Sequence, residues 1–352
     1  MIIVVAAFPV TENQKDGMVQ RVLHIDSLIK RYPRVYLDIS FRRFFRKICY
    51  TDGHATIYRL NFFVHAFVIA RLLRRAKLIY MHSAYNALKS ILFPSKAHVV
   101  FDVHGIVPEE LLQEKKKLAS WIYRLAERMA IIRCNTIICV SQSMLRHLKA
   151  KYNNNIKGNE IILPIIPKVD DIITADQVHC AMRDDRAVIY AGGMQAWQNV
   201  DKMLDAAKEQ PNLKYTFLTG EIQRFSLLLR ENSLMNVICL SVKPEEVKDY
   251  YLKHEYGFIL RDDVLVNQVA CPTKLMEYLY WGVIPIIITP RVGDFDADSL
   301  SGVTLDQFIS GKLPNELSRS LIRKKNHQAV KLMIDTASSY QNQLQALLIK
   351  FK

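Results

Sequence analysis

The sequence lacks the patterns that mark most zinc and disulfide proteins. It has 6 cysteines among 352 residues, none of them in a Cys-x-x-Cys pair, and its 10 histidines form no His-Glu-x-x-His motif. Structural zinc sites and small disulfide frameworks depend on such spacings, so neither is expected. Scattered single cysteines on apolar segments fit a reducing compartment. No pattern in the sequence points to a metal site or to an organic cofactor.

Long hydrophobic runs are also missing. The densest, Phe62–Ala70 and Val283–Thr289, are much shorter than the roughly 20 residues that a membrane-spanning helix needs. The N-terminal run MIIVVAAFP has no basic residues before it, which is typical of a first strand and not of a signal peptide. These absences predict a cytoplasmic protein without a transmembrane anchor.

Negative charge is scarce in one half of the chain. The net charge is +14, yet residues 1–160 hold 26 Lys and Arg against 11 Asp and Glu, whereas residues 161–352 hold 22 against 23. The whole basic excess thus lies in the first half, which predicts an anionic partner there, such as a membrane surface, a nucleic acid or a phosphorylated acceptor. Because that half has no recognisable helix-turn-helix, RNP or zinc module, we expect no nucleic acid.

Apolar strand-like runs alternate with helical patterns along the whole chain. This alternation predicts an α/β protein with parallel sheets that are covered by helices on both faces. Strands are expected at Ile2–Ala7, Val35–Ile39, Leu78–His82, His98–Val103, Thr136–Val140, Ile161–Leu163, Ala187–Ala191, Tyr215–Thr219, Val237–Leu240, Gly257–Leu260 and Ile284–Ile288.

The pattern restarts after a proline-containing stretch. We expect a Rossmann-like domain over residues 1–164, a linker over 165–186 and a second Rossmann-like domain over 187–330. A C-terminal helix over 331–352 follows, and a return to the first domain is one option for it. Two such domains that face each other would leave a cleft between them. Ligands of these sheets bind at the carboxyl ends of the strands, so functional residues should follow the strands.

The run from Cys271 to Ile287 is the most informative segment. Pro272 suits the first position of a helix and Gly282 suits its C-terminal cap. Lys274 falls in the first turn, where a cation opposes the helix dipole unless an anion binds there. Glu277 shares its face, and a carboxylate can accept hydrogen bonds from a ribose diol. The alternative is an ordinary surface Lys–Glu pair.

This run, P-T-K-L-x-E-Y-L-x-x-G-x-x-P-I, resembles the donor-binding segment of family 4 glycosyltransferases of the GT-B fold, especially of their bacterial surface-polysaccharide branch. Shorter pieces along the chain support the resemblance through their order and spacing. They are Ala6–Pro9 with Asp16-Gly17, Asp102–Gly105 with Pro108–Glu110, Val140–Met144, and Tyr190–Gly193 with Trp197-Gln198.

The resemblance implies transfer of a sugar from a nucleotide-sugar donor, usually with retention and without a metal. A UDP-sugar is the expected donor, and a glycan or a polyprenyl-diphosphate-linked glycan is the expected acceptor. It also implies roles, in which Lys274 holds the diphosphate, Glu277 holds the ribose and His104 lies near the reacting sugar. The remaining candidates are Asp102 beside His104, Glu109 and Glu110 on the acceptor side, and Thr273, Arg261, Gly192, Gly193 and Gly17 on the donor side.

Two departures from the family pattern leave other functions open. Val269 stands where many members have a glutamate that contacts the donor sugar, and Gln198-Asn199 stands where many have Lys-Gly. Arg261 is the candidate second cation, because it follows the strand Gly257–Leu260. The alternatives are a weakly active homologue that serves as a binding subunit of a polysaccharide assembly complex, and a GT-B sugar-nucleotide epimerase.

One basic segment has the features of a membrane-surface helix. Its apolar residues recur at i, i+3, i+4 and i+7 with cations between them: Phe41, Arg42, Arg43, Phe44, Phe45, Arg46, Lys47 and Ile48. A short amphipathic helix of this kind is typical of proteins on the surface of an anionic membrane. The alternative is a surface helix with its apolar stripe in the core. We expect a peripheral protein on the inner face of the cytoplasmic membrane.

Overall fold

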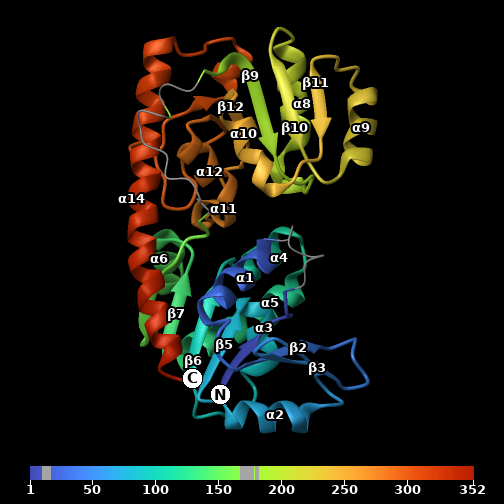
Figure 1. Ribbon diagram of the computed structural model, residues 1–352, viewed down its shortest axis with the longest axis vertical. Helices are drawn as coiled ribbons and strands as arrows, with labels where there is room; N and C mark the ends of the chain where they lie inside the picture. The colour runs from blue at the N-terminus through green and yellow to red at the C-terminus, as the bar shows by residue number, and fades with distance from the viewer. Residues whose placement is uncertain (10–16, 167–177, 179–181) are drawn as a thin grey trace. The chain divides into compact units, whose positions relative to one another are not determined.

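The computed structural model describes residues 1–9, 17–166, 178 and 182–352 (Figure 1). The chain divides into two compact units. Unit 1 comprises Met1–Pro164 and Ala337–Lys352, and unit 2 comprises Ile165–Thr336. Each unit is an α/β layer structure with its own apolar core, as the alternation of strands and helices in the sequence predicts.

Unit 1 is built on an eight-stranded sheet in the order β3-β4-β2-β1-β5-β6-β7-β8. All neighbouring strands are parallel except the edge pair β3 and β4. The six predicted strands of this region lie in the sheet, whereas β3 and β4 were not predicted. The bounds are β1 Ile2–Val5, β2 Arg34–Ser40, β3 Ile48–Asp52, β4 Ala55–Asn61, β5 Leu78–His82, β6 His98–Val103, β7 Thr136–Cys139 and β8 Asn159–Ile162.

Helices cover the sheet of unit 1. They are α1 Gly17–Ile29, α2 Ala66–Arg75, α3 Ser83–Ser90, α4 Val107–Gln113, α5 Lys117–Arg133 and α6 Gln142–Lys151. The last part of the C-terminal helix α14 (Glu316–Ile349) also belongs to this unit, because Leu344 and Leu348 are buried in the same core cluster as Ile2 on β1. Strands with apolar side chains on both faces need this double cover.

Unit 2 is built on a six-stranded parallel sheet in the order β11-β10-β9-β12-β13-β14. The strands are β9 Asp184–Ala191, β10 Lys214–Leu218, β11 Val237–Leu240, β12 His254–Ile259, β13 Ile284–Ile287 and β14 Val303–Thr304. The helices are η2 Ala196–Gln198, α8 Val200–Glu209, α9 Ile222–Glu231, η3 Pro244–Glu246, α10 Val247–Tyr251, α11 Leu265–Val269, α12 Thr273–Trp281, α13 Leu305–Ile309 and the first part of α14.

The strand order of each sheet reverses at a central strand. In unit 1, β1 lies between β2 and β5, and in unit 2, β9 lies between β10 and β12. On the two sides of such a point, the connections that follow the strands run to opposite faces of the sheet. This leaves a crevice at the carboxyl ends of the strands, which is the usual ligand site. In unit 2 the residues that follow β9 and those that follow β12 border this crevice.

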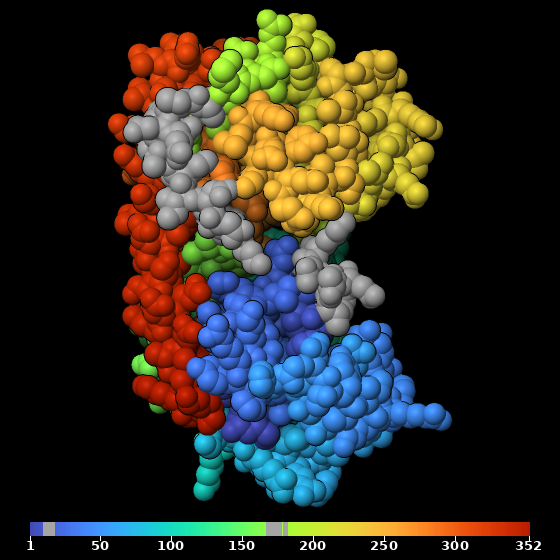
Figure 2. Space-filling view, viewed as in Figure 1, coloured from blue at the N-terminus to red at the C-terminus, as the bar shows by residue number. Residues whose placement is uncertain are grey.

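The segment that was predicted as an amphipathic helix is not helical, so the predicted helix is wrong, whereas the place of these residues on a membrane face stays a prediction. Residues 41–47 form bends between β2 and β3, and Phe44 has a left-handed φ of 64°. The Ser40 hydroxyl accepts hydrogen bonds from two backbone N–H groups of the segment, and the Asn61 amide donates to two of its carbonyls. Asn61 thus binds two carbonyls that a helix would have paired, whereas the N–H groups that bind Ser40 are ones that a helix leaves free at its start. Figure 2 shows in blue the surface of unit 1 to which the segment contributes.

Among the helices of the described ranges, none is long and apolar enough to cross a membrane. The longest, α14, carries several charged residues between Glu316 and Asp335. This finding agrees with the absence of long hydrophobic runs.

Candidate active site

The informative helix α12 begins one residue later than the sequence suggested. Pro272 is the N-cap with an extended ψ of 112°, so Thr273 is the first helical residue and Lys274 the second. Gly282 ends the helix with a φ of 76°, which confirms the predicted left-handed cap. The free N–H groups of the first turn, that of Thr273 among them, point out of the helix start. They form one side of the candidate site in unit 2.

Lys274 lies against the end of β9. Its ammonium is 3.7 Å from the centroid of the Tyr190 ring and 3.4 Å from Oε1 of Gln198, to which it donates. A Cβ atom on Gly192 would lie 2.4 Å from Nζ, so the glycine leaves the space that the ammonium occupies. Burial and the nearby Arg261 guanidinium hold the pKa of Lys274 well below its usual value.

Arg261 places a second cation beside the first. It follows β12, is half-buried, and its pKa is lowered by burial. Within the described part of the chain, no carboxylate lies within ion-pairing distance of the Lys274 ammonium or the Arg261 guanidinium. Glu277, one turn along the helix, attracts Lys274 but forms no ion pair with it, so burial and the repulsion from Arg261 still dominate. An anion bound beside the two cations would therefore lower their free energy. The structure therefore brings together the two cations that the sequence analysis proposed.

Glu277 lies one turn along α12. Its Oε2 accepts a hydrogen bond of 2.7 Å from the Tyr251 hydroxyl, and burial raises its pKa. Its Oε1 has no hydrogen-bond donor among the described residues and is not sealed from solvent. One oxygen is thus fixed by the protein, while the other can accept a hydrogen bond from a ligand hydroxyl.

Short hydrogen bonds fix the loop after β9. The Tyr190 hydroxyl donates to the carbonyl of Gly193 at 2.5 Å. Asn199, left-handed at φ 55°, donates through its side chain to the Leu260 carbonyl and to Asp262, both at the end of β12. The loops that follow the two central strands are thereby joined. Asn199, which stands where the family pattern has Gly, makes both of these bonds, whereas Gln198 before it accepts from Lys274.

In unit 1, Asp102 is enclosed and does not have the exposure of a catalytic residue. Its side chain is 0% exposed, and both of its oxygens accept from the Arg21 guanidinium at 2.9 and 3.0 Å. The Tyr80 hydroxyl donates to it at 2.9 Å, and Nδ1 of His82 lies 3.4 Å away. The Arg21 guanidinium keeps the pKa of Asp102 far below its usual value, even though burial opposes this. These contacts favour Asp102 as a positioning residue, and its predicted place beside His104 among the catalytic residues stays a prediction.

His104 follows β6 and stays a predicted catalytic residue. Its ring lies 6.1 Å from that of His82, and its Nε2 has no hydrogen-bond partner among the described residues. Burial lowers its pKa to about 4, although the Asp102 carboxylate works in the opposite direction. His104 is therefore neutral at pH 7, with one ring nitrogen that can donate or accept a single hydrogen bond.

The two glutamates at the start of α4 have different environments. Glu109 is tied to α6, because Lys151 donates to it at 3.0 Å and His147 lies 3.7 Å away, and its pKa is lowered to about 2. This structural role speaks against Glu109 as an acceptor contact. Glu110 has no hydrogen-bond donor among the described residues, and burial together with neighbouring glutamates raises its pKa to about 7. Its Oε1 lies 2.6 Å from where a Cβ of Gly105 would be.

Gly17 is the first residue of α1 and belongs to unit 1, whereas Asp16 lies outside the described residues. Sequence reasoning missed Arg21, His82, Tyr190 and Tyr251 as parts of the two sites. Each of these side chains makes its contacts with residues that are distant along the chain or on another element. No local sequence pattern therefore marks them as parts of a site. No cluster of three potential metal ligands occurs in the described ranges.

Comparison with known proteins identifies the fold. Residues 24–161 match the family model described as Glycosyltransferase Family 4. Sucrose-phosphate synthase from Thermosynechococcus elongatus is similar over 99% of this chain and 98% of its own, with a TM-score of 0.71 and 13% identity. Anabaena HepE in complex with UDP and glucose is similar over 99% of both chains, with a TM-score of 0.67 and 13% identity.

A further similar structure is an α,α-trehalose-phosphate synthase (UDP-forming) from Burkholderia vietnamiensis. It covers 99% of this chain and 98% of its own, with a TM-score of 0.64 and 10% identity. No curated protein matches the sequence significantly. At these identities the solved structures establish the fold, while the family match supports the class of enzyme. With two Rossmann-like parallel-sheet domains and this match, the chain is a GT-B protein that resembles the family 4 glycosyltransferases.

Proposed function

We propose that the protein transfers a sugar from a nucleotide-sugar donor, a UDP-sugar, to an oligosaccharide or polyprenyl-diphosphate-linked acceptor in the synthesis of a bacterial surface polysaccharide. Unit 2 binds the donor, and the carboxyl edge of the sheet of unit 1 binds the acceptor. The observation that supports this best is the pair of desolvated cations, Lys274 and Arg261, at the start of α12. The complexes of similar proteins with UDP agree with it.

In this reaction, the bond between the anomeric carbon and the phosphate oxygen breaks, and the nucleoside diphosphate leaves with the electron pair. The acceptor hydroxyl oxygen forms the new bond to that carbon, and its proton passes to the departing phosphate or to water. Lys274 and Arg261 supply positive charge where negative charge develops on the leaving group, so no divalent metal is required. Glu277 positions the nucleotide through its ribose hydroxyls.

The roles in unit 1 follow from protonation. A neutral His104 donates or accepts one hydrogen bond with a sugar hydroxyl. Glu110, with a pKa near 7, can orient or partly deprotonate an acceptor hydroxyl. Retention of configuration is part of the proposal through the family resemblance, and so is a place on the inner face of the cytoplasmic membrane.

The experiment that tests the donor site is calorimetric titration of the protein with UDP, GDP, CDP, ADP and dTDP, preceded by a thermal-shift screen. A ligand that binds only the folded state must raise the melting temperature. We expect one nucleoside diphosphate, UDP, to bind clearly more tightly than the others. Absence of binding by all five at millimolar concentration would contradict the proposal.

A binding subunit without efficient turnover is the second candidate. Two observations favour it: the buried Val269 stands where many relatives have a donor-contacting glutamate, and Gln198 supplies only a neutral amide to Lys274. The two candidates differ in turnover. Hydrolysis or transfer of a bound UDP-sugar supports the enzyme, whereas tight nucleotide binding without any product supports the binding subunit.

A further inference from the structure

Helix α5 has a solvent-exposed stripe of large apolar side chains. Leu118, Trp121, Ile122 and Leu125 are spaced at i, i+3, i+4 and i+7, so they lie on one face of the helix. Leu118 is 73% exposed and Trp121 is 64% exposed. The opposite face holds buried residues, Ser120, Glu127 and Ile131 among them. We define these four exposed residues as the α5 stripe.

The stripe differs from an ordinary protein surface because its exposed apolar side chains are contiguous. Single exposed apolar residues are common, but a continuous row that includes a tryptophan marks a contact surface. The helix already buries a full face against unit 1, so the stripe is not needed for its attachment. The stripe therefore requires a partner outside unit 1.

Positive charge surrounds the stripe. Five exposed cations lie on α5 or directly before it: Lys115, Lys116, Lys117, Arg124 and Arg128. Of the acidic residues on the same segment, Glu114 pairs with Lys116, and Glu127 is buried and pairs with Lys151 on α6. An apolar row with a tryptophan and a basic border matches the interface of an anionic bilayer, where apolar side chains insert and cations meet lipid phosphates. A soluble polyanion would use the cations but not the stripe.

The position of the stripe connects it to the acceptor side of unit 1. The Ser120 hydroxyl, in the first turn of α5, donates to the Pro108 carbonyl in the first turn of α4 at 2.7 Å. Tyr123 of α5 packs edge-on against Tyr85 at 5.0 Å, and Glu110 contributes to the raised pKa of Tyr85. The helix that bears the stripe is thus part of the framework around Glu110.

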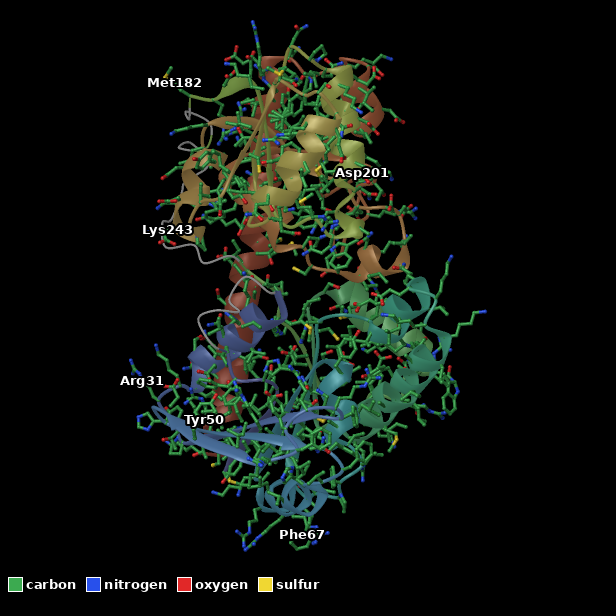
Figure 3. The ribbon with its side chains drawn as sticks, turned by 90° about the vertical axis from the view of Figure 1, so that its right-hand side faces the viewer. Arg31, Tyr50, Phe67, Met182, Asp201 and Lys243 are labelled. Atoms are coloured by element: carbon green, nitrogen blue, oxygen red, sulfur yellow. The ribbon has the colours of Figure 1, made fainter. Side chains whose placement is uncertain are left out.

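We propose that the α5 stripe inserts into the headgroup region of an anionic membrane and so brings the acceptor side of unit 1 to a lipid-borne substrate. This inference rests on the proposed function in one respect, the lipid-borne acceptor. The exposed Phe63, Val64 and Phe67, before and on α2, form a second apolar surface, and Phe67 projects away from its helix (Figure 3). That surface is the natural comparison, since it is also basic through Arg71 and Arg74.

The test is sedimentation of the full-length protein with two kinds of vesicles. One kind is phosphatidylcholine alone, and the other is phosphatidylcholine and phosphatidylglycerol in a ratio of about 7 to 3. The stripe variant is L118S/W121S/L125S. The matched controls are L227S/M235S, which removes exposed apolar residues from unit 2, and F63S/F67S, which removes them near α2. Melting temperature and UDP affinity are measured for all variants, so a folding defect or a failed donor site is recognised independently of membrane binding.

We expect the wild type to bind the anionic vesicles and not the neutral ones, and the stripe variant to bind at least about tenfold more weakly with unchanged UDP affinity. K115E/K116E/K117E should weaken binding in the same way. Unchanged vesicle binding by a folded stripe variant overturns the inference, as does loss of binding in F63S/F67S alone. A change from dimer to monomer in the stripe variant without a change in vesicle binding would identify the stripe as an interface between copies, which also overturns it.

Discussion

Arg21 on α1 and Asp102 at the end of β6, 81 positions apart, form a two-point ion pair from which solvent is fully excluded. Removing one partner leaves the other buried and uncompensated, so Asp102→Ala should lower the free energy of unfolding by about 3–5 kcal/mol. Urea denaturation measures this. Asp38→Asn is the control, because its partner Arg59 is partly exposed and burial already raises the pKa of Asp38. Equal losses in both variants would contradict a special role of the buried pair.

Lys274→Ala should weaken binding of the nucleoside diphosphate by about 10- to 100-fold, because a charge-assisted contact to phosphate is worth about 1.5–3 kcal/mol. The exposed Lys214, paired with Asp184, provides the control variant Lys214→Ala. Gly192→Ala should act like the Lys274 variant, because the added Cβ lies 2.4 Å from the flexible end of Lys274 and displaces it, while it also approaches the Tyr190 hydroxyl at 3.0 Å. Calorimetry measures the dissociation constant of the nucleoside diphosphate for each variant. A wild-type value in Lys274→Ala would show that this residue does not contact the ligand.

Glu277→Gln should weaken discrimination between ribose and deoxyribose. The free Oε1 can accept hydrogen bonds from the 2′ and 3′ hydroxyls, whereas an amide group accepts less strongly and also donates. We expect the ratio of the dissociation constants for dUDP and UDP to fall by roughly tenfold. Tyr251→Phe, which removes the donor to Oε2, should have a smaller effect of the same kind. A ratio that stays at the wild-type value in Glu277→Gln would show that this carboxylate does not contact the ribose.

Glu110→Gln should stabilise the protein at pH 8 while it impairs transfer to the acceptor. The folded-state pKa near 7 lies above the ordinary value of 4.5, so ionisation of this side chain costs stability as the pH rises between the two. The gain at pH 8 should be about 1–3 kcal/mol and should largely vanish at pH 5. Glu231→Gln, at an exposed position in unit 2, is the control. Lower stability at pH 8 would mean that the carboxylate has a stabilising partner.

Stability should fall as the pH drops from about 6.5 to 4. Burial lowers the pKa of both His24 and His104 to about 4, so over this range the unfolded chain takes up protons that the folded protein does not. Each histidine should contribute on the order of 1–3 kcal/mol. Because Glu110 acts in the opposite direction between pH 4.5 and 7, the slope is best measured in Glu110→Gln. His24→Gln and His104→Gln should each flatten it, and an unaltered slope in both would contradict the assignment.

The alternation of strands and helices could be predicted because fully buried parallel strands leave short, continuous apolar runs. Leu78–His82, His98–Val103 and Val237–Leu240 have the bounds that the sequence suggested. The edge hairpin of β3 and β4 was missed, since β3 is largely exposed and its residues give no apolar run. The parallel-sheet class of both domains is confirmed.

The predicted helix at residues 41–47 shows the limit of periodicity over a short window. A segment this short can follow the helical repeat by chance, and here the Asn61 amide takes the carbonyls of Phe41 and Arg43 that a helix would have paired. The cations of the donor site were found because a local motif places Lys274 at a helix start. The Arg21–Asp102 pair was not, because no rule of local spacing links two residues on separate elements.

Helix α14 ties the completion of the first unit to the end of the chain. Leu344 and Leu348 are fully buried beside Ile2, in the same core that β1 helps to form. During synthesis the residues of β1 leave the ribosome well before Leu344 and Leu348, so the core around Ile2 stays incomplete until those leucines follow. Unit 2 is translated later than most of unit 1, yet its residues end at Thr336, so its core can form before Leu344 and Leu348 are synthesised. Unit 1 therefore completes its core only after the last turns of α14 have been synthesised. Until then β1 and its neighbouring strands expose apolar surface that can aggregate.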